Sequence, residues 1–398
     1  MPSLITVAEA QAQVLRRAAP LEGEDVAVAD AAGRVLLEDA AAAVDLPPFP
    51  SSAMDGFTLR AVDAPATLPV AFRIAAGRPA PRPLQAGEAM AIATGGVVPD
   101  GADAVVPIEY VVEHDNEVAV EKAPAPGANV RPRGGDVRAG EVVVAAGVRL
   151  APGAVGALAA AGIPAVRCGR RPRVAVLTTG TELARPGEAL APGQVYEANG
   201  AMLAAAVAAA GGSAELLASV EDTDEAHRAA IARGLEADVL VTSGGVSVGP
   251  HDLVRRVETE LGVEEVFWQV AVKPGKPVSF GVRGRTLVFG LPGNPVSSLV
   301  GFELFVRPAL LALQGAAEPL PRFELGRLAR TVARNPVRDE FLRARSRLDQ
   351  DGVVLEPLDG QESHMIARAA AADALVLAPL GEGELQAGEL VRYLALRS

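Results

Sequence analysis

Residues 173–182 read RVAVLTTGTE and decide the fold, because they join a short β-branched run to a turn of threonine and glycine. From residue 173 onward, such runs alternate with longer helical stretches, which is typical of a parallel sheet with crossover helices. We expect strands at 173–179, 214–220, 238–242, 265–272 and 286–290, and helices at 199–210, 224–235, 252–261 and from 295. Sheets of this kind bind ligands at the carboxyl ends of their strands, so the polar turns there are the candidate site.

The segments on either side of this region predict other structure. A helix is expected at 6–19, and three prolines at 47, 48 and 50 then break the chain before a β-rich stretch from about 51 to 136. A further helix at 151–161 is expected to pack on the first helix. After residue 320 the pattern predicts a small domain of β-strands.

Composition excludes several classes of protein. The chain has 398 residues, which predicts two to four domains, and its net charge of -12 with 4% aromatic residues argues against nucleic-acid binding. A single cysteine, Cys168, and four histidines without an HxxxH pair argue against a zinc enzyme. The longest run of small apolar residues, 201–210, is about half the ~20 residues that a membrane span needs. With no leader pattern at residues 1–19, we expect a cytoplasmic protein.

A glycine-rich turn follows the expected strand at 238–242. Gly244, Gly245 and Ser247 lie where free backbone N–H groups and a helix dipole favour a phosphate, although glycines also simply make turns. The same residues formally match the G-x-S-x-G nucleophile elbow, and Asp359 and His364 follow in the required order. A serine hydrolase that uses Ser247 therefore stays an alternative.

Lysine is rare in this chain and concentrated in one turn. Only three of the 37 basic residues are lysine, and Lys273 and Lys276 lie together in the turn KPGKP. Proline and glycine stiffen such a turn, so two ammonium groups there could clamp an oxyanion. A solvated basic turn is the alternative interpretation.

Carboxylates follow three of the expected strands, at Glu182, Asp222 and Asp252. Carboxylates gathered opposite phosphates commonly hold Mg²⁺, whereas a single one is usually a helix cap or a surface charge. A second strand-to-helix turn, GLPGNPVS at 290–297, is another candidate for anion binding and includes Ser297.

Six motifs in one order resemble the molybdopterin molybdenumtransferase family, the MoeA proteins and the gephyrin E domain. They are PFPSSAMDGF at 48–57, TGG at 94–96, TGTEL at 179–183, GGVSVG at 244–249, KPGKP at 273–277 and LPGNPVS at 291–297. The resemblance spans nearly the whole chain. Departures occur at Pro250-His251, at residues 196–199 (YEAN) and at Glu362, where the family more often has glycine.

The resemblance implies a multidomain α/β plus β protein that forms an elongated homodimer. The implied domains are a split helical domain (1–46 plus 141–170), an inserted β-rich domain (47–140), a central α/β molybdopterin-binding domain with a mostly parallel sheet (171–320) and a C-terminal β-barrel (321–398). The implied activity inserts molybdenum from molybdate into adenylylated molybdopterin, with Mg²⁺-dependent release of AMP. An upstream molybdopterin adenylyltransferase is the implied partner. The gephyrin comparison also leaves a non-catalytic scaffold as an alternative.

The sequence patterns and the resemblance together assign roles to individual residues. The expected catalytic residues are Glu182, Asp222, Asp252 and Asp55, with Asp222 and Asp252 as metal ligands. The expected substrate-binding residues are Thr94, Asp136, Gly244, Gly245, Ser247, Lys273, Lys276, Ser297, Arg338, Arg343 and Ser363. Arg338 matches the arginine of the family's barrel better than Arg343 does, and bidentate geometry favours an arginine for an oxyanion.

Overall fold

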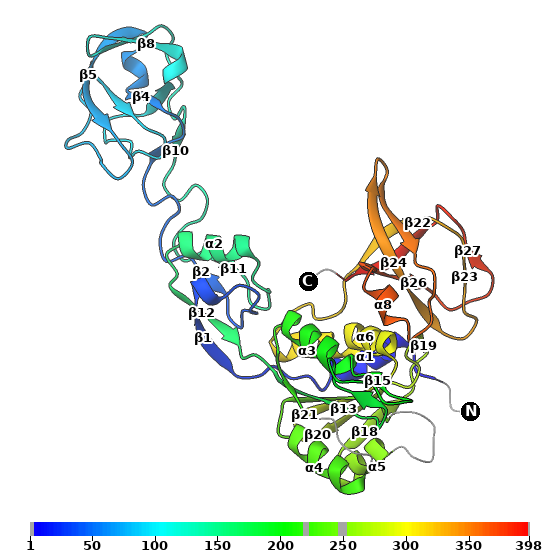
Figure 1. The fold of residues 1–398 in the computed structure, drawn as a ribbon. Helices are drawn as coiled ribbons and strands as arrows, with labels where there is room; N and C mark the ends of the chain where they lie inside the picture. Colours follow the sequence, from blue (N-terminus) through cyan, green and yellow to red (C-terminus); the bar gives the residue numbers. More distant parts are fainter. Residues whose placement is uncertain (1–3, 218–222, 246–252, 397–398) are drawn as a thin grey trace.

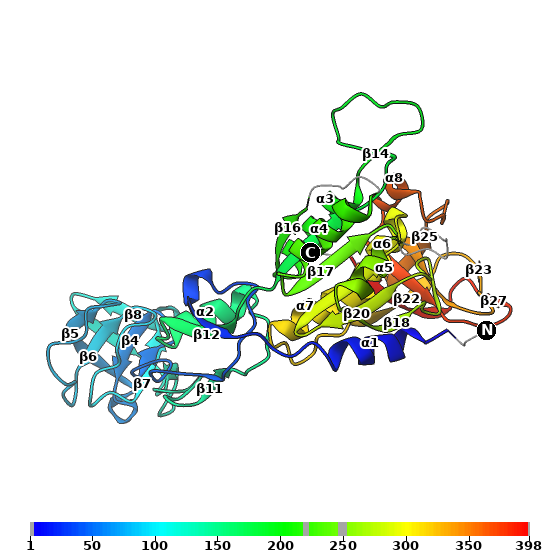
Figure 2. The same cartoon turned by 90° about the horizontal axis from the view of Figure 1, so that it is seen from below.

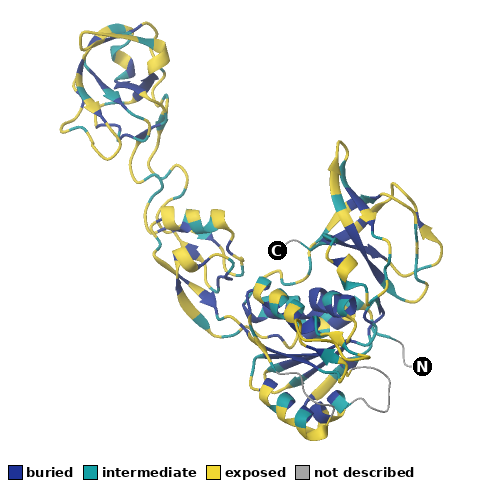
Figure 3. Cartoon of the chain, viewed as in Figure 1, coloured by how far each residue is buried: buried dark blue, intermediate teal, exposed yellow. Residues whose placement is uncertain are grey.

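The computed structural model describes residues 4–217, 223–245 and 253–396. A central α/β domain and a β-barrel lie side by side, and an arm runs from the central domain to a β-rich domain at its far end (Figure 1). Each of these parts has its own cluster of buried apolar side chains (Figure 3). The separate cores support the implied division into four domains, whose boundaries stay a prediction.

The central sheet has six strands in the order β16-β13-β17-β21-β20-β18. Their bounds are β13 (Arg173–Thr178), β16 (Ser213–Leu216), β17 (Val239–Ser243), β18 (Glu264–Trp268), β20 (Ser279–Arg283) and β21 (Thr286–Leu291). Only β20 runs against its two neighbours in this sheet. Strand β18 therefore ends at the same edge as β13, β17 and β21, and the KPGKP turn follows at that edge.

The expected strand at 265–272 was wrong in extent, and β20 was not expected. The strand ends at Trp268, and the chain returns as β20 after the KPGKP turn. A separate short strand, β19 (Val272–Lys273), occupies the end of the expected run and pairs with the barrel. A continuous apolar run does not reveal where a strand changes its partner, which explains the error.

Helices cover both faces of the central sheet. Successive side chains of β13 point to opposite faces of the sheet, so Val176 belongs to one apolar cluster and Leu177 to another. The helices are α3 (Asn199–Ala209), α4 (Asp224–Gly234), α5 (Leu253–Glu260), α6 (Pro295–Gly301), the π-helical η4 (Phe302–Val306) and α7 (Arg307–Leu313). Residues 295–313 have a mean hydropathy of 1.6 and the length of a bilayer span, but 78% of that stretch is buried, as in the core helix of a globular domain.

The N-terminal helix belongs to the central core. Helix α1 (Val7–Leu15) begins at Thr6 with a capping box, and its buried Ala10 and Val14 pack with η4 and α7. Helix α2 (Pro152–Ala160) packs instead against η1 (Val28–Asp30) and β11 (Val142–Val144). The expectation that these two helices pack together is therefore wrong, because α1 buries its apolar side chains in another core.

The arm and the domain at its end are built from short strands. The segment next to the central domain holds the pairs β1 (Gly23–Ala27) with β12 (Ala165–Gly169) and β2 (Ala40–Ala41) with β11. The far domain is a six-stranded sheet of β4 (Gly56–Leu59), β5 (Ala66–Ile74), β6 (Ala89–Ile92), β7 (Ala104–Pro107), β8 (Val111–His114) and β9 (Glu117–Val120). Its other elements are β3 (Ser51–Ser52) paired with β10 (Val130–Arg131), η2 (Ala61–Asp63) and η3 (Ile108–Tyr110). Both views show this domain well away from the central domain (Figures 1 and 2).

The C-terminal domain is a closed barrel, because β24 pairs with β26 as well as with β25. Its strands are β22 (Phe323–Leu328), β24 (Asp339–Asp349), β25 (Gly352–Pro357), β26 (Ala374–Ala378) and β28 (Leu390–Ala395), with the outer pair β23 (Val332–Ala333) and β27 (Glu384–Leu385) and the short helix α8 (Ile366–Ala369). Strand β19 pairs in parallel with the start of β24. The barrel is thus fastened to the edge of the central domain where the sheet strands end.

Where the arm meets the central domain, Gly169 lies against the end of α7. A Cβ atom built on Gly169 would lie 2.1 Å from the carbonyl oxygen of Gln314, and Gln314 Nε2 donates to the carbonyls of Ala210 and Leu310. We predict that Gly169→Ala lowers the free energy of unfolding by about 3 kcal/mol, as expected for overpacking against backbone. Chemical denaturation followed by circular dichroism measures this loss.

Gly156→Ala is the matched control for that substitution. Gly156 lies within α2, and in the described part of the chain no atom lies within 4 Å of its added Cβ. Alanine should stabilise this helix by about 0.5–1 kcal/mol. Equal stability of the Gly169→Ala chain and the unaltered protein would show that the junction accommodates the extra atom.

Candidate functional site

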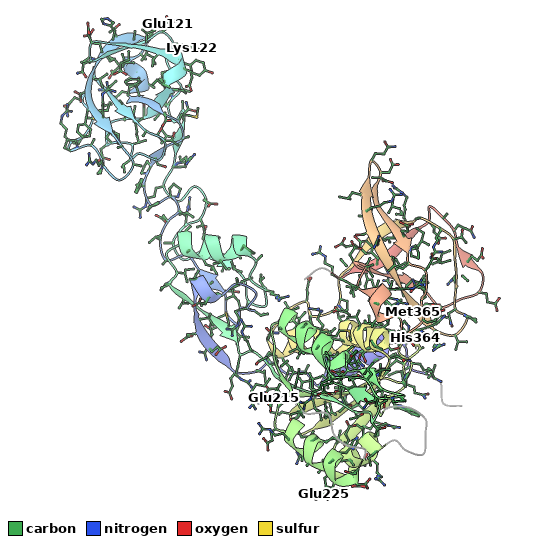
Figure 4. All side chains as sticks on the ribbon, viewed as in Figure 1. Glu121, Lys122, Glu215, Glu225, His364 and Met365 are labelled. Carbon is green, nitrogen blue, oxygen red and sulfur yellow. The ribbon has the colours of Figure 1, made fainter. Side chains whose placement is uncertain are left out.

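A cavity of about 620 Å³ opens where β13, β17 and β21 end. Thr178 and Ser243 line it from the strand ends, Asn294 lines it from the turn before α6, and His364 and Ile366 line it from the barrel. His364 and Met365 lie on the side of the barrel that faces the central domain (Figure 4). The cavity is therefore shared between two domains, at the edge where such sheets bind ligands.

Asn199, the first residue of α3, connects the turns that form the cavity floor. Its Nδ2 donates to Ser243 Oγ at 2.9 Å and to the carbonyl of Gly293 at 2.7 Å. Ser243 Oγ lies 3.3 Å from the carbonyl of Pro292 and can donate to it. A carbonyl only accepts, so the amide nitrogen must face Gly293. Asn199 Oδ1 is buried, and no described residue bonds to it.

Two carboxylates line the cavity near Asn199. Glu197 Oε1 accepts the backbone N–H of Gly200 at 2.8 Å, in the first turn of α3. Glu182 lies beside Gly180, where an added Cβ would be 2.7 Å from the Glu182 carboxylate. Gly180 has φ +153°, a backbone conformation that favours glycine. The turn 180–182 therefore presents Glu182 as the sequence predicts.

The glycine turn after β17 contributes only in part to the described site. Gly244 and Gly245 have φ of 99° and 67°, and Gly244 packs against the Thr179 backbone. Residues with these angles are almost always glycine. The remaining predicted residues in this region, Ser247 and Asp252, lie outside the described residues, as does Asp222 after β16. Within 4–217, 223–245 and 253–396, no group of three or more His, Cys, Asp or Glu side chains could hold a metal ion.

The lysine turn lies beside the cavity, between the sheet edge and the barrel. Lys273 Nζ is 2.9 Å from Glu340 Oε1 on β24, and Pro277 lines the cavity itself. Gly275 packs against Ser297, because a Cβ there would lie 3.4 Å from the Ser297 carbonyl. The structure therefore brings both lysines close to the first turn of α6.

A barrel loop brings Ser363 to the same place. Ser363 Oγ is 2.9 Å from Asn294 Nδ2, and its carbonyl accepts the N–H of Val296 at 3.1 Å. Residues 360–365 thus lie against the turn that begins α6. The departure at Glu362 leaves these contacts of Ser363 in place.

The two candidate arginines of the barrel differ in what they contact. Arg343 is 1% exposed, and its guanidinium donates to the carbonyls of Gly360, Glu362 and Met365. Burial lowers the pKa of Arg343. Arg338 is half-buried, and its backbone N–H donates to Asn335 Oδ1. The Arg343 side chain therefore shapes the Ser363 loop, which leaves Arg338 as the better candidate for an oxyanion.

The predicted residues of the arm lie apart from this cavity within one chain. Asp55 accepts two hydrogen bonds from Thr94, at 2.6 Å from its N–H and at 2.9 Å from its hydroxyl. These bonds, the backbone one foremost, lower the pKa of Asp55. Asp136 is exposed, and its N–H donates to Leu46. All three belong to the far domain or its connection, so one chain does not bring them to the sheet edge (Figure 1).

Sequence reasoning did not identify several residues of the site. Asn199 was expected only as the first residue of a helix, and Glu197 only as a departure from a motif. Gln361 holds the Arg343 backbone, because its Oε1 accepts the Arg343 N–H at 3.0 Å and its Nε2 donates to the Arg343 carbonyl at 2.9 Å. Neither Gln361 nor Glu340 carries a recognisable signal, because their partners come from segments that are distant in sequence. The triad expected for a serine hydrolase is not assembled among its two described members: Asp359 pairs with Arg330 at 3.0 Å, and no hydrogen bond joins it to His364.

Models of known protein families match nearly the whole length of this chain. Family models match residues 5–162 as the MoeA N-terminal region (domain I and II), 175–312 as a probable molybdopterin binding domain and 326–396 as the MoeA C-terminal region (domain IV). The chain is 37% identical to molybdopterin molybdenumtransferase 2 of Mycobacterium tuberculosis over 95% of both chains. It is 33% identical to the molybdopterin molybdenumtransferase of Haemophilus influenzae over 98% of both.

Solved structures of MoeA proteins have the same fold over nearly the whole chain. A molybdopterin biosynthesis MoeA protein from Pyrococcus horikosii superposes with a TM-score of 0.80 at 32% identity and covers 100% of both chains. Another, from Pyrococcus horikoshii OT3, has a TM-score of 0.84 at 28% identity over 99% of this chain and 100% of that one. With its four parts, its closed barrel and its shared cavity, the chain belongs to the molybdopterin molybdenumtransferase family.

Proposed function

We propose that this chain inserts molybdenum from molybdate into adenylylated molybdopterin, in the cavity between the central sheet and the barrel. The observation that carries the proposal is that acceptor oxygens and the lysine turn lie at the same edge of the central sheet. Carboxylate and amide oxygens line the cavity, and the turn that carries Lys273 and Lys276 reaches it through Pro277. The family membership supports the same chemistry.

The proposed substrate contacts divide the site into two halves. The glycine turn at Gly244 and Gly245, with Ser247, cradles the phosphates through backbone N–H groups near a helix N-terminus. Lys273, Lys276, Ser297, Arg338 and Ser363 receive the oxyanion. The two dithiolene sulfurs of the pterin replace one oxygen of molybdate, which leaves as water with the two thiol protons, while a second water cleaves the phosphoanhydride and AMP leaves.

Mg²⁺ is the proposed metal for this reaction. Carboxylate and carbonyl oxygens are its preferred ligands, and the cavity offers Glu182, Glu197 and Asn199 Oδ1, which bonds to none of the described residues, so the donor chemistry fits. Asp222 and Asp252 are the proposed ligands. When bound, the ion would neutralise negative charge that develops on the phosphate oxygens. Glu182 orients the attacking water.

The working unit is proposed to be a homodimer in the cytoplasm. Asp55 and Thr94 lie in the far domain and Asp136 lies at its connection, away from the cavity of their own chain, so a second copy would have to bring them to a cavity. An adenylyltransferase that makes the substrate is the expected upstream partner. A hydrolase that uses Ser247 is disfavoured by the Asp359–Arg330 ion pair. A purely structural scaffold would not require carboxylates such as those of Glu182 and Glu197 to line the cavity.

We predict that Glu182→Gln slows single-turnover AMP release by about 100-fold, the usual scale for removing a group that assists proton transfer. Binding of adenylylated molybdopterin should change little, because the phosphate contacts remain. The control is Glu188→Gln, which removes an exposed carboxylate on the same segment. Equal rates for the two variants would remove Glu182 from the reaction.

The metal ligands give a second prediction. Asp222→Asn and Asp252→Asn should each raise the Mg²⁺ concentration that gives half-maximal AMP release, because an amide oxygen carries no charge to hold the ion. Asp224→Asn is the control, since Asp224 pairs with Arg256 at the surface. A Mg²⁺ dependence unchanged in both variants would assign the metal to other residues.

Subunit complementation tests the shared site. Asp55→Ala and Glu182→Ala chains should each be inactive alone, whereas mixing them should restore about a quarter of the activity through one intact composite site per heterodimer. The AMP release assay measures the recovery, and native mass spectrometry of size-tagged chains verifies subunit exchange. Mixtures that exchange subunits yet stay inactive would contradict a site shared between copies.

A further inference from the structure

Strand β19 sets Lys273 against a carboxylate of the barrel wall. Lys273 and Glu340 are partners in the parallel pairing of β19 with β24, and Nζ lies 2.9 Å from Oε1. The Glu340 side chain is 11% exposed, whereas that of Lys273 is 44% exposed. The backbone register therefore fixes the acid in place, while the ammonium group stays open to solvent.

This ion pair makes the two lysines of the turn unequal. In the described ranges Lys276 forms no ion pair, so its charge is not offset by an adjacent carboxylate. Lys273 has its charge offset by Glu340 before any ligand arrives. A largely buried carboxylate is costly without its partner, so Glu340 retains Lys273 strongly. An anion that binds beside Lys273 also meets the field of Glu340.

We propose that Glu340 is a positioning residue that acts as the resident counter-anion of the oxyanion site. It holds the Lys273 ammonium group at the start of β24, in the turn that reaches the cavity through Pro277, and an incoming dianion competes with it for that group. Affinity for the oxyanion is thereby kept lower than two unopposed lysines would give, which favours release of the metal to the pterin. The inference rests on the proposed function, because it takes molybdate as the ligand of the lysine turn.

The arrangement predicts unequal effects of removing the two lysines. Lys276→Ala removes one attractive charge. Lys273→Ala removes an ammonium group that Glu340 already engages, and the repulsion between Glu340 and a dianion is present with or without Lys273. Lys273→Ala should therefore weaken anion binding less than Lys276→Ala does. Adding Glu340→Gln to Lys273→Ala should restore part of the loss, because the repelling charge is then gone.

Glu340→Gln alone should strengthen binding, which a purely structural role for Glu340 would not do. Isothermal titration of the full-length protein with sodium molybdate measures the effect, and sodium perrhenate provides a tetrahedral anion of similar shape with half the charge. Because Coulomb energy scales with the charge of the ligand, we expect a gain of about tenfold for molybdate and about threefold for perrhenate. Glu384→Gln removes an exposed carboxylate elsewhere on the barrel and should leave both affinities unchanged.

The outcomes separate this inference from the proposed function. Failure of the unaltered protein to bind molybdate in a lysine-dependent way would overturn the oxyanion assignment, and this inference with it. Normal molybdate binding that Glu340→Gln leaves unchanged or weakens would overturn the counter-anion role alone. If Glu340→Gln does not fold, the comparison of Lys273→Ala with Lys276→Ala decides, because equal losses would contradict the role of Glu340.

Discussion

The pairing of β19 with β24 is the contact on which the site depends. It fastens the barrel to the edge of the central sheet and sets Lys273 beside Glu340. The same attachment lets Ser363 reach the turn before α6. Without the barrel, the cavity would be lined by only one domain. The site is therefore a product of domain arrangement as much as of strand order.

Local signals explain why much of this could be predicted from the sequence. The run at 173–178 is a buried strand because helices cover both faces of the central sheet. Pro295 begins a helix because the fixed φ of proline favours the first helical position. Other features depend on contacts distant in sequence. Helix α1 carries only a short apolar face, so its sequence does not reveal which core receives it. Glu340 and Arg343 differ in role because β19 brings Lys273 to the Glu340 carboxylate, whereas carbonyls of the loop at 360–365 accept from the Arg343 guanidinium, and no local pattern records either contact.

Because the chain is elongated, the far domain lies away from the cavity of its own chain. Its Asp55 is an exposed carboxylate whose ionised form two hydrogen bonds from Thr94 stabilise. A carboxylate that is held in its ionised form, yet lies far from the cavity of its own chain, fits the proposal that a second copy completes the site. The close packing of Gly169 against Gln314 would then set the direction of the arm. In the proposed dimer, stability at this junction would be connected with geometry at the cavity of the second copy.

The most direct test of the account is the stoichiometry of one turnover. Purified protein is mixed with adenylylated molybdopterin, Mg²⁺ and molybdate, and AMP and molybdenum-loaded pterin are counted over time by chromatography and metal analysis. The account predicts that the two products form in equal amounts and that AMP release depends on molybdate. Rapid AMP release with no molybdenum in the pterin would contradict it.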